Sequence, residues 1–208
     1  YEPFKKISKS NMVIQRALAG AERVFDLLDS REITVENQGN TVLTPPFQNL
    51  QFEHVYFSYP GSQEDALKDI NLSISPGEKV AIVGPSGAGK SSLVQLIPRF
   101  YDPQQGSIYL NSRKLSEYTL ESLRQFIGIV SQETFLFNMS IRENITYGLK
   151  EISQEELEKV CKIANAFDFI SALPHGFDTV IGERGVKLSG GEKQRITIAR
   201  ALLKDPAL

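Results

Sequence analysis

The segment Gly84–Ser91 constrains the fold more than any other part of the chain. It reads Gly-Pro-Ser-Gly-Ala-Gly-Lys-Ser, which fits the pattern G-x-x-x-x-G-K-[ST]. The short apolar run Lys79–Val83 stands before it, and such a run is typical of a buried parallel strand. Residues 91–99 after it have helical character. A glycine-rich loop between a strand and a helix predicts a phosphate-binding loop, or P-loop.

The residues of this loop suit a polyphosphate. Its glycines let backbone N–H groups point inward, and the following helix adds its positive end. We expect Lys90 to reach the β and γ phosphates of a nucleotide, Ser91 to give its hydroxyl to Mg²⁺, and Ser92 to lie near the α phosphate. The candidate nucleotide-binding residues here are Gly84, Ser86, Gly87, Ala88, Gly89, Lys90, Ser91 and Ser92. A P-loop alone leaves kinases, GTPases and many ATPases open.

Apolar periodicity predicts a mixed α/β core before residue 137 and helices after it. Strand patterns cover residues 50–59, 70–74, 79–83, 106–110 and 126–130, and helical patterns cover residues 91–99 and 119–125. In the first strand the alternation slips by one at Glu53-His54, which predicts a β-bulge. Three Ser-x-x-Glu capping boxes predict helix starts at Ser140, Ser153 and Ser189, because each box can satisfy free backbone N–H groups.

The N-terminal residues predict an amphipathic helix and a linker. Within residues 5–30 apolar side chains recur at spacings of three and four, at Ile14, Leu18, Ala21, Phe25 and Leu28. The polar residues 36–41 and then Pro45-Pro46 follow, and Pro and Gly interrupt regular structure. We therefore expect the main domain to begin near Phe47.

The composition excludes several classes of protein. The 23 Lys and Arg against 25 Asp and Glu give a net charge of -2, so no basic excess favours nucleic acid as a partner. The longest apolar run, Val80–Val83, has four residues, whereas a membrane-spanning helix needs about 20. The single cysteine, Cys161, cannot form an intramolecular disulfide, which favours a reducing compartment.

A second motif is Leu188-Ser189-Gly190-Gly191-Glu192, whose serine stands 99 residues after Lys90. It places two glycines at a capped helix start. Such a start lets the backbone approach an anion closely, so the motif predicts a second phosphate site.

Together the two motifs resemble those of the ATP-binding cassette (ABC) family, most closely the exporters that fuse a transmembrane domain to each cassette. In that family the P-loop of one subunit and the signature motif of its partner hold one ATP between them. The resemblance assigns this signature role to Leu188, Ser189, Gly190, Gly191 and Glu192, although the family usually has Gln where Glu192 stands.

Further segments carry the same resemblance. Tyr59, which lies 25 residues before Gly84, is similar to the aromatic residue that stacks on adenine. Gln132 is similar to the Q-loop glutamine, a catalytic residue that contacts Mg²⁺ and the attacking water. Thr179–Gly185 resembles the loop with which exporter cassettes touch the membrane domain of the partner, and Ala21–Asp29 resembles the cytoplasmic tail of an exporter's last membrane helix.

The resemblance implies a fold and a function. The fold is α/β, a P-loop NTPase core with an antiparallel β subdomain and an α-helical signature subdomain. Residues 1–46 would be the extension of the last membrane helix plus a linker, and residues 47–208 the nucleotide-binding domain, with its helical subdomain at 137–190. The implied function is an ATP-hydrolysing motor that drives export at the cytoplasmic face of a membrane. Its cofactors would be ATP and Mg²⁺, and its partners a second cassette, in the simplest case an identical one, and the transmembrane domains.

Part of the family's catalytic machinery does not occur in this stretch. In the family an apolar strand ending in Asp-Glu and then a switch histidine follow the signature helix, but here Lys204–Leu208 stands where that strand would start. We therefore expect the stretch to belong to a longer protein, to lack turnover by itself, and to aggregate when isolated, because the sheet would lack a central strand. His54 and His175 do not match the switch position and are expected to be structural.

Two alternatives stay open at this point. A soluble ABC protein would share both motifs, but the compact spacing from Lys90 to Ser189 and the exporter-type loop argue against it. A non-hydrolysing regulatory ATP-binding module would be favoured if the natural chain ended at Leu208. A nucleotide kinase would have no use for the second motif.

Overall fold

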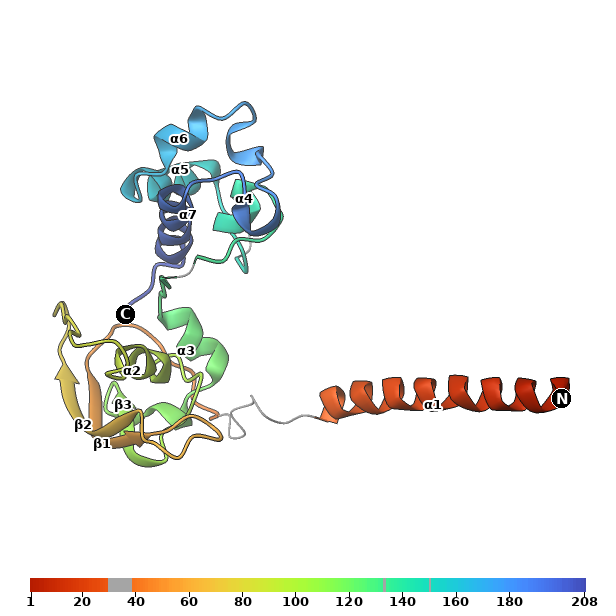
Figure 1. Cartoon of the computed structure of the whole chain (residues 1–208). Coiled ribbons are helices and arrows are strands. Elements are labelled where there is room, and N and C mark those ends of the chain that lie inside the picture. Colours follow the sequence, from red (N-terminus) through yellow and green to blue (C-terminus); the bar gives the residue numbers. More distant parts are fainter. Residues whose placement is uncertain (30–38, 133, 150) are drawn as a thin grey trace. The chain divides into compact units, whose positions relative to one another are not determined.

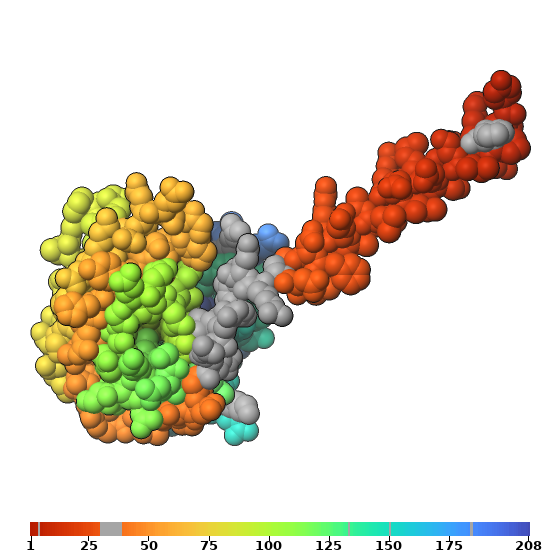
Figure 2. Space-filling model, turned by 90° about the horizontal axis from the view of Figure 1, so that it is seen from below, coloured from red at the N-terminus to blue at the C-terminus, as the bar shows by residue number. Residues whose placement is uncertain are grey.

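The computed structural model describes residues 1–29, 39–132, 134–149 and 151–208, which fall into two units, Tyr1–Glu36 and Asn37–Leu208. The first unit holds the helix α1 (Glu2–Asp29), and the predicted helix is thereby confirmed. Its apolar side chains are exposed, for example Ile14 and Leu18. Figure 2 draws the atoms of this helix in red to orange. No described helix has an apolar stretch long enough to cross a lipid bilayer. The predicted linker lies outside the described residues up to position 38.

The first half of the second unit is built on an antiparallel sheet (Figure 1). Its strands are β1 (Leu50–Phe57), β2 (Leu67–Ile74), β3 (Gln105–Leu110) and β4 (Arg113–Lys114), in the order β2-β1-β3-β4. The predicted bulge is confirmed, because the pairing of β1 with β2 shifts register between Phe52 and Val55. His54 adopts a φ of 48° there, and a Cβ at Gly106 would clash with its carbonyl oxygen. The bulge therefore requires glycine in the facing strand.

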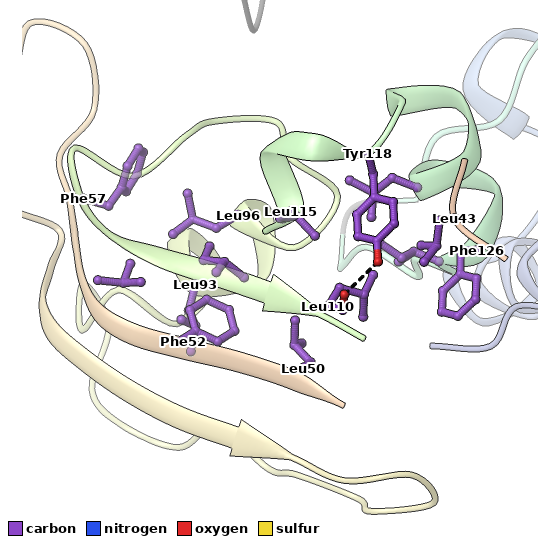
Figure 3. Packing of buried hydrophobic residues seen from close by; sticks show 14 of the residues in the cluster. Leu43, Leu50, Phe52, Phe57, Leu93, Leu96, Leu110, Leu115, Tyr118 and Phe126 are labelled. Atoms are coloured by element: carbon purple, nitrogen blue, oxygen red, sulfur yellow. Dashed lines mark hydrogen bonds between the residues drawn. The ribbon is translucent and has the colours of Figure 1, made fainter. Parts of the chain in front are cut away.

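A hydrophobic core fills the space between this sheet and three short helices, which are α2 (Lys90–Leu96), the 3-10 helix η1 (Leu115–Glu117) and α3 (Leu120–Phe126). Alternate residues of the strands, such as Leu50, Phe52 and Leu110, are fully buried (Figure 3). The buried Tyr118 hydroxyl donates a 2.9 Å hydrogen bond to the Leu110 carbonyl oxygen, so its one polar atom is satisfied.

The second half of this unit is helical and has its own core. Its elements are α4 (Ile141–Ile145), α5 (Gln154–Ile163), α6 (Phe167–Ser171), the 3-10 helices η2 (Gly176–Asp178) and η3 (Glu183–Gly185), and α7 (Gly190–Leu203) (Figure 1). All three predicted capping boxes form, at Ser140, Ser153 and Ser189. The α/β fold class is therefore confirmed, whereas the domain bounds at residues 46 and 137–190 stay predictions.

Two of the predicted strands are wrong. Neither Lys79–Val83 nor Phe126–Val130 forms a strand, and the exposed fraction of Val83 reaches 87%. A run becomes a strand only when a neighbour shares its hydrogen bonds. Among the described residues, Lys79–Val83 has no such neighbour. Phe126–Val130 has one only at its start, where Gly128 N donates to the Leu208 carbonyl oxygen at 2.9 Å. The predicted helix over 91–99 is also shorter, because Pro98 lacks the N–H needed to continue it.

Cys161 is expected to resist thiol reagents in the folded protein. Its side chain is fully buried in α5, and burial raises the pKa of the thiol from 9.0 to about 12, with Glu158 adding to the shift. The reactive thiolate is then about a thousandfold rarer than for an ordinary cysteine. Labelling with a chromogenic disulfide at pH 8 checks this, with Ile163→Cys, an exposed position of the same helix, as the control. Equal labelling rates at the two positions would contradict the packing of α5.

Candidate nucleotide-binding site

The P-loop is an open turn whose glycines are required by its backbone. Gly87 and Gly89 have φ angles of 82° and 80°, in the left-handed region that favours glycine. Gly89 is also the N-cap of α2, and a Cβ on it would clash with the Ala66 carbonyl oxygen. Residues 84–88 are exposed, so the loop surface is available to a ligand.

Lys90 reaches back across this loop. Its Nζ donates hydrogen bonds to the carbonyl oxygens of Gly84, at 2.9 Å, and Pro85, at 2.7 Å. The ammonium group is therefore held at the loop by two weak, neutral acceptors, which a phosphate oxygen can replace with stronger charge-assisted bonds. Ser91 follows it and is exposed.

Tyr59 lies against the buried side of α2. Its hydroxyl is 2.9 Å from Ser92 Oγ and donates to Gln95 Oε1 at 3.0 Å. Its ring packs edge-on against Phe57 and Tyr101, with centroid distances of 4.9 and 5.3 Å. The structure thus brings together two residues that the sequence analysis selected separately, Tyr59 and Ser92. It adds Gln95, which stands one helical turn after Ser92 and could have been found from that spacing.

Gln132 makes no hydrogen bond to these residues in the part of the chain that the structure describes. It is exposed, and none of the hydrogen bonds of the described residues joins it to the P-loop. Glu133, the next residue of the predicted Q-loop, lies outside the described residues.

The donor set fits Mg²⁺ only together with a nucleotide. Ser91 and Gln132 offer a hydroxyl and an amide oxygen, which are hard donors of the type Mg²⁺ prefers. In the described ranges no group of three or more His, Cys, Asp or Glu side chains could hold a metal. A Mg²⁺ ion here would therefore depend on the phosphate oxygens of a nucleotide for its negatively charged ligands.

The signature residues form the exposed start of α7. Ser189 is its N-cap, and both its backbone N and its Oγ donate to Glu192 Oε2, each at 2.7 Å. These hydrogen bonds hold the pKa of Glu192 below its ordinary value. Leu188 is buried, whereas Gly190 and Gly191 are exposed in the first turn. The first N–H groups of a helix lack intrahelical partners, so this turn can receive an anion.

The loop Thr179–Gly185 pairs with the segment that follows Gln132. Ser140 and Val180 form an antiparallel bridge, and Ile181 N donates to the Met139 carbonyl oxygen at 3.2 Å. The loop that the resemblance assigns to membrane-domain contact is thus joined to the start of α4, eight residues after Gln132.

A hydrogen-bond network around the buried Asn144, which the sequence did not predict, ties α7 to the same segment. Arg200 Nε donates to the Asn144 carbonyl oxygen at 2.7 Å, and its two terminal nitrogens donate to Phe135 O and Asn144 Oδ1, both at 3.1 Å. The Asn144 amide donates in turn to the carbonyl oxygens of Phe137 and Ser140, each at 3.0 Å. No periodicity or motif marks Arg200 or Asn144, because their roles depend on tertiary contacts.

Comparisons with known proteins agree with this geometry. Residues 67–208 match the sequence family described as "ABC transporter". The chain is 50% identical over 204 residues to an ATP-dependent lipid A-core flippase of Alkalilimnicola ehrlichii and 48% identical over 205 residues to one of Desulfotalea psychrophila. These matches cover 98% and 99% of this chain, but only 34% and 36% of the relatives.

A solved structure shares the fold. It is described as a bacterial Atm1-family ABC exporter with ATP bound, and it matches with a TM-score of 0.82 and 42% identity over 93% of this chain and 34% of its own. The chain thus spans about a third of the length of the proteins it matches. The sequence match, the shared fold and the P-loop geometry agree, and the chain belongs to the ABC transporter family.

Proposed function

We propose that this chain is the nucleotide-binding domain of an ABC exporter, that the full-length protein binds and hydrolyses ATP through it to drive export across a membrane, and that the 208-residue stretch alone lacks turnover. The observation that carries the proposal is that one chain presents two exposed elements of the kind that can receive a phosphate, the P-loop and the start of α7. No hydrogen bond between described residues joins them. Each element is half of a site, so two identical copies placed head to tail complete two sites.

We propose a role for each site residue. Lys90 would exchange its loop carbonyls for the β and γ phosphates, and the exposed backbone of Gly84, Ser86, Gly87, Ala88 and Gly89 would surround them. Tyr59 would support the adenine, and Ser92 the α phosphate. Ser91 and Gln132 would hold Mg²⁺, which when bound neutralises charge on the phosphates. Gln132 would also orient the attacking water.

Closure of the two copies would be the step that ATP drives. The γ phosphate contacts the partner's signature, residues 188–192, only in the closed pair, so it supplies the differential affinity that shifts the equilibrium. Gln132 and the loop Thr179–Gly185 would pass the motion to the membrane domains. The Ser140–Val180 bridge supports this for the loop Thr179–Gly185, because it joins that loop to a position eight residues after Gln132.

The comparisons favour an exporter over a soluble ABC protein or a regulatory module. The relatives are named flippases, and the solved structure is named an exporter. Because this chain covers about a third of the length of those proteins, we propose that the protein to which it belongs is longer and carries transmembrane domains outside this stretch. The chain would then lie at the cytoplasmic face of a membrane.

Cross-linking between two single-cysteine variants tests the head-to-tail arrangement. Ser86→Cys in the P-loop and Ser189→Cys in the signature lie at exposed positions, and Cys161 is buried. We expect a disulfide-linked dimer when the two variant exporters are assembled together with ATP under mild oxidation, and none when either is assembled alone. Ser153→Cys, the cap of α5, replaces Ser189→Cys in the control and should give no cross-link. An ATP-dependent cross-link in either single-variant protein would contradict the arrangement.

A further inference from the structure

The Ser189 hydroxyl, which would face the partner's nucleotide, is already engaged by a carboxylate. Ser189 Oγ and Ser189 N both donate to the same oxygen of Glu192, each at 2.7 Å, while Glu192 N donates to Ser189 Oγ at 3.4 Å. A hydroxyl carries one proton. While Ser189 Oγ donates this proton to Glu192, it has no proton left to donate to a phosphate. Its lone pairs then face the phosphate oxygens and repel them.

The same carboxylate places a charge in the first turn of α7. Hydrogen bonds from the Ser189 side chain and backbone lower the pKa of Glu192, and the nearby Arg195 lowers it further, so the group is ionised at neutral pH. A negative group in the first turn stabilises the helix start. It also occupies part of the positive field that Gly190 and Gly191 would present to a phosphate.

We propose that Glu192 is a positioning residue that competes with the γ phosphate of the partner's ATP for the Ser189 hydroxyl, and thereby weakens closure of the pair. Closure then requires the hydroxyl to rotate from Glu192 Oε2 to the phosphate. The carboxylate keeps its second donor, the backbone N of Ser189, so the helix cap survives the exchange. This inference rests on the proposed function, because it needs the signature to face a nucleotide.

The chain contains a matched control for the competition. Ser153 and Glu156 form the same capping box at α5, with the Ser153 Oγ and N donating to Glu156 Oε2 at 2.7 and 3.0 Å. These hydrogen bonds likewise lower the pKa of Glu156. That box is not part of either half-site, so Glu156→Gln removes the same charge and weakens the same kind of cap without touching the nucleotide.

The test compares Glu192→Gln with Glu156→Gln and the unchanged protein in the full-length exporter. Glutamine keeps an acceptor oxygen for Ser189 but no charge, so it competes for the hydroxyl proton more weakly than the carboxylate does. A dye is attached at the exposed position Lys68 in each copy, and energy transfer between the two dyes reports closure of the pair. Titration with ATP then gives the ATP concentration at which half of the pairs are closed. We expect Glu192→Gln to lower this concentration by about fivefold, which is the scale of one charge contact in water. Glu156→Gln should match the unchanged protein.

The salt dependence of closure distinguishes competition by Glu192 from a purely structural role of this residue. Raising NaCl from about 0.05 to about 0.5 M screens the repulsion between Glu192 and phosphate, so the benefit of Glu192→Gln should shrink severalfold. If the Glu192→Gln pair half-closes at the same ATP concentration as the Glu156→Gln pair, or at a higher one, Glu192 is only a helix cap. That result overturns this inference and leaves the proposed function standing. If ATP fails to close the unchanged protein, the proposed function is overturned as well.

Discussion

Replacing Lys90 by alanine should lower the ATPase turnover of the proposed exporter by about 100- to 1000-fold. The Lys90 Nζ already lies within 2.9 Å of two carbonyl oxygens of the loop, so a small rotation brings it to a phosphate at the same place. The lysine is the one charged side chain of the motif Gly84–Ser91. Without it, charge that develops on the transferred phosphoryl group loses a preorganised partner.

Steady-state kinetics of the reconstituted exporter check this prediction. Lys79→Ala is the matched control, because Lys79 is an exposed lysine just before the apolar run that precedes the loop. We expect the control to retain the turnover of the unchanged protein. A Lys90→Ala variant with unaltered turnover would show that Lys90 does not contact the nucleotide.

Local sequence rules predicted the parts of the site that depend on neighbouring residues. A capping box needs only a serine and a glutamate three residues apart, so the geometry at Ser189 followed from the sequence. The P-loop backbone is also local, because the left-handed φ of Gly87 and Gly89 suits few residues other than glycine. The β-bulge at His54 was visible as a slip in the alternation.

The parts that depend on distant partners could not be predicted in the same way. The run Lys79–Val83 has the composition of a strand, but composition does not supply the neighbouring strand that would share its hydrogen bonds. The contact between the Tyr59 hydroxyl and Ser92 joins positions 33 residues apart. Arg200 is an ordinary helical arginine in the sequence, and only the fold shows that it bonds residues of the segment after Gln132.

Replacing Asn144 by alanine should destabilise the helical half by about 3 kcal/mol, which is large for a single polar residue. Asn144 is fully buried. Its amide donates to Phe137 O and Ser140 O, and its Oδ1 accepts from Phe137 N at 2.9 Å and from Arg200 at 3.1 Å. Alanine removes these four hydrogen bonds, each worth about 0.5–1.5 kcal/mol, and leaves Phe137 N without its acceptor, whereas Ser140 O keeps the Asn144 backbone N and Arg200 keeps the Asn144 carbonyl oxygen.

Hydrogen exchange in the assembled exporter measures this loss where it occurs. An opening free energy lowered by about 3 kcal/mol accelerates amide exchange in α4 and α7 by roughly 100-fold. Arg142→Ala is the control from α4 itself, because Arg142 pairs with Asp178, a side chain that is 75% exposed, and such surface pairs contribute at most about 1 kcal/mol. If both variants exchange alike, the network does not hold α7 to the segment after Gln132. If only Asn144→Ala loosens both helices, the signature and the Q-loop segment share one cooperative unit, which the proposed transmission of closure requires.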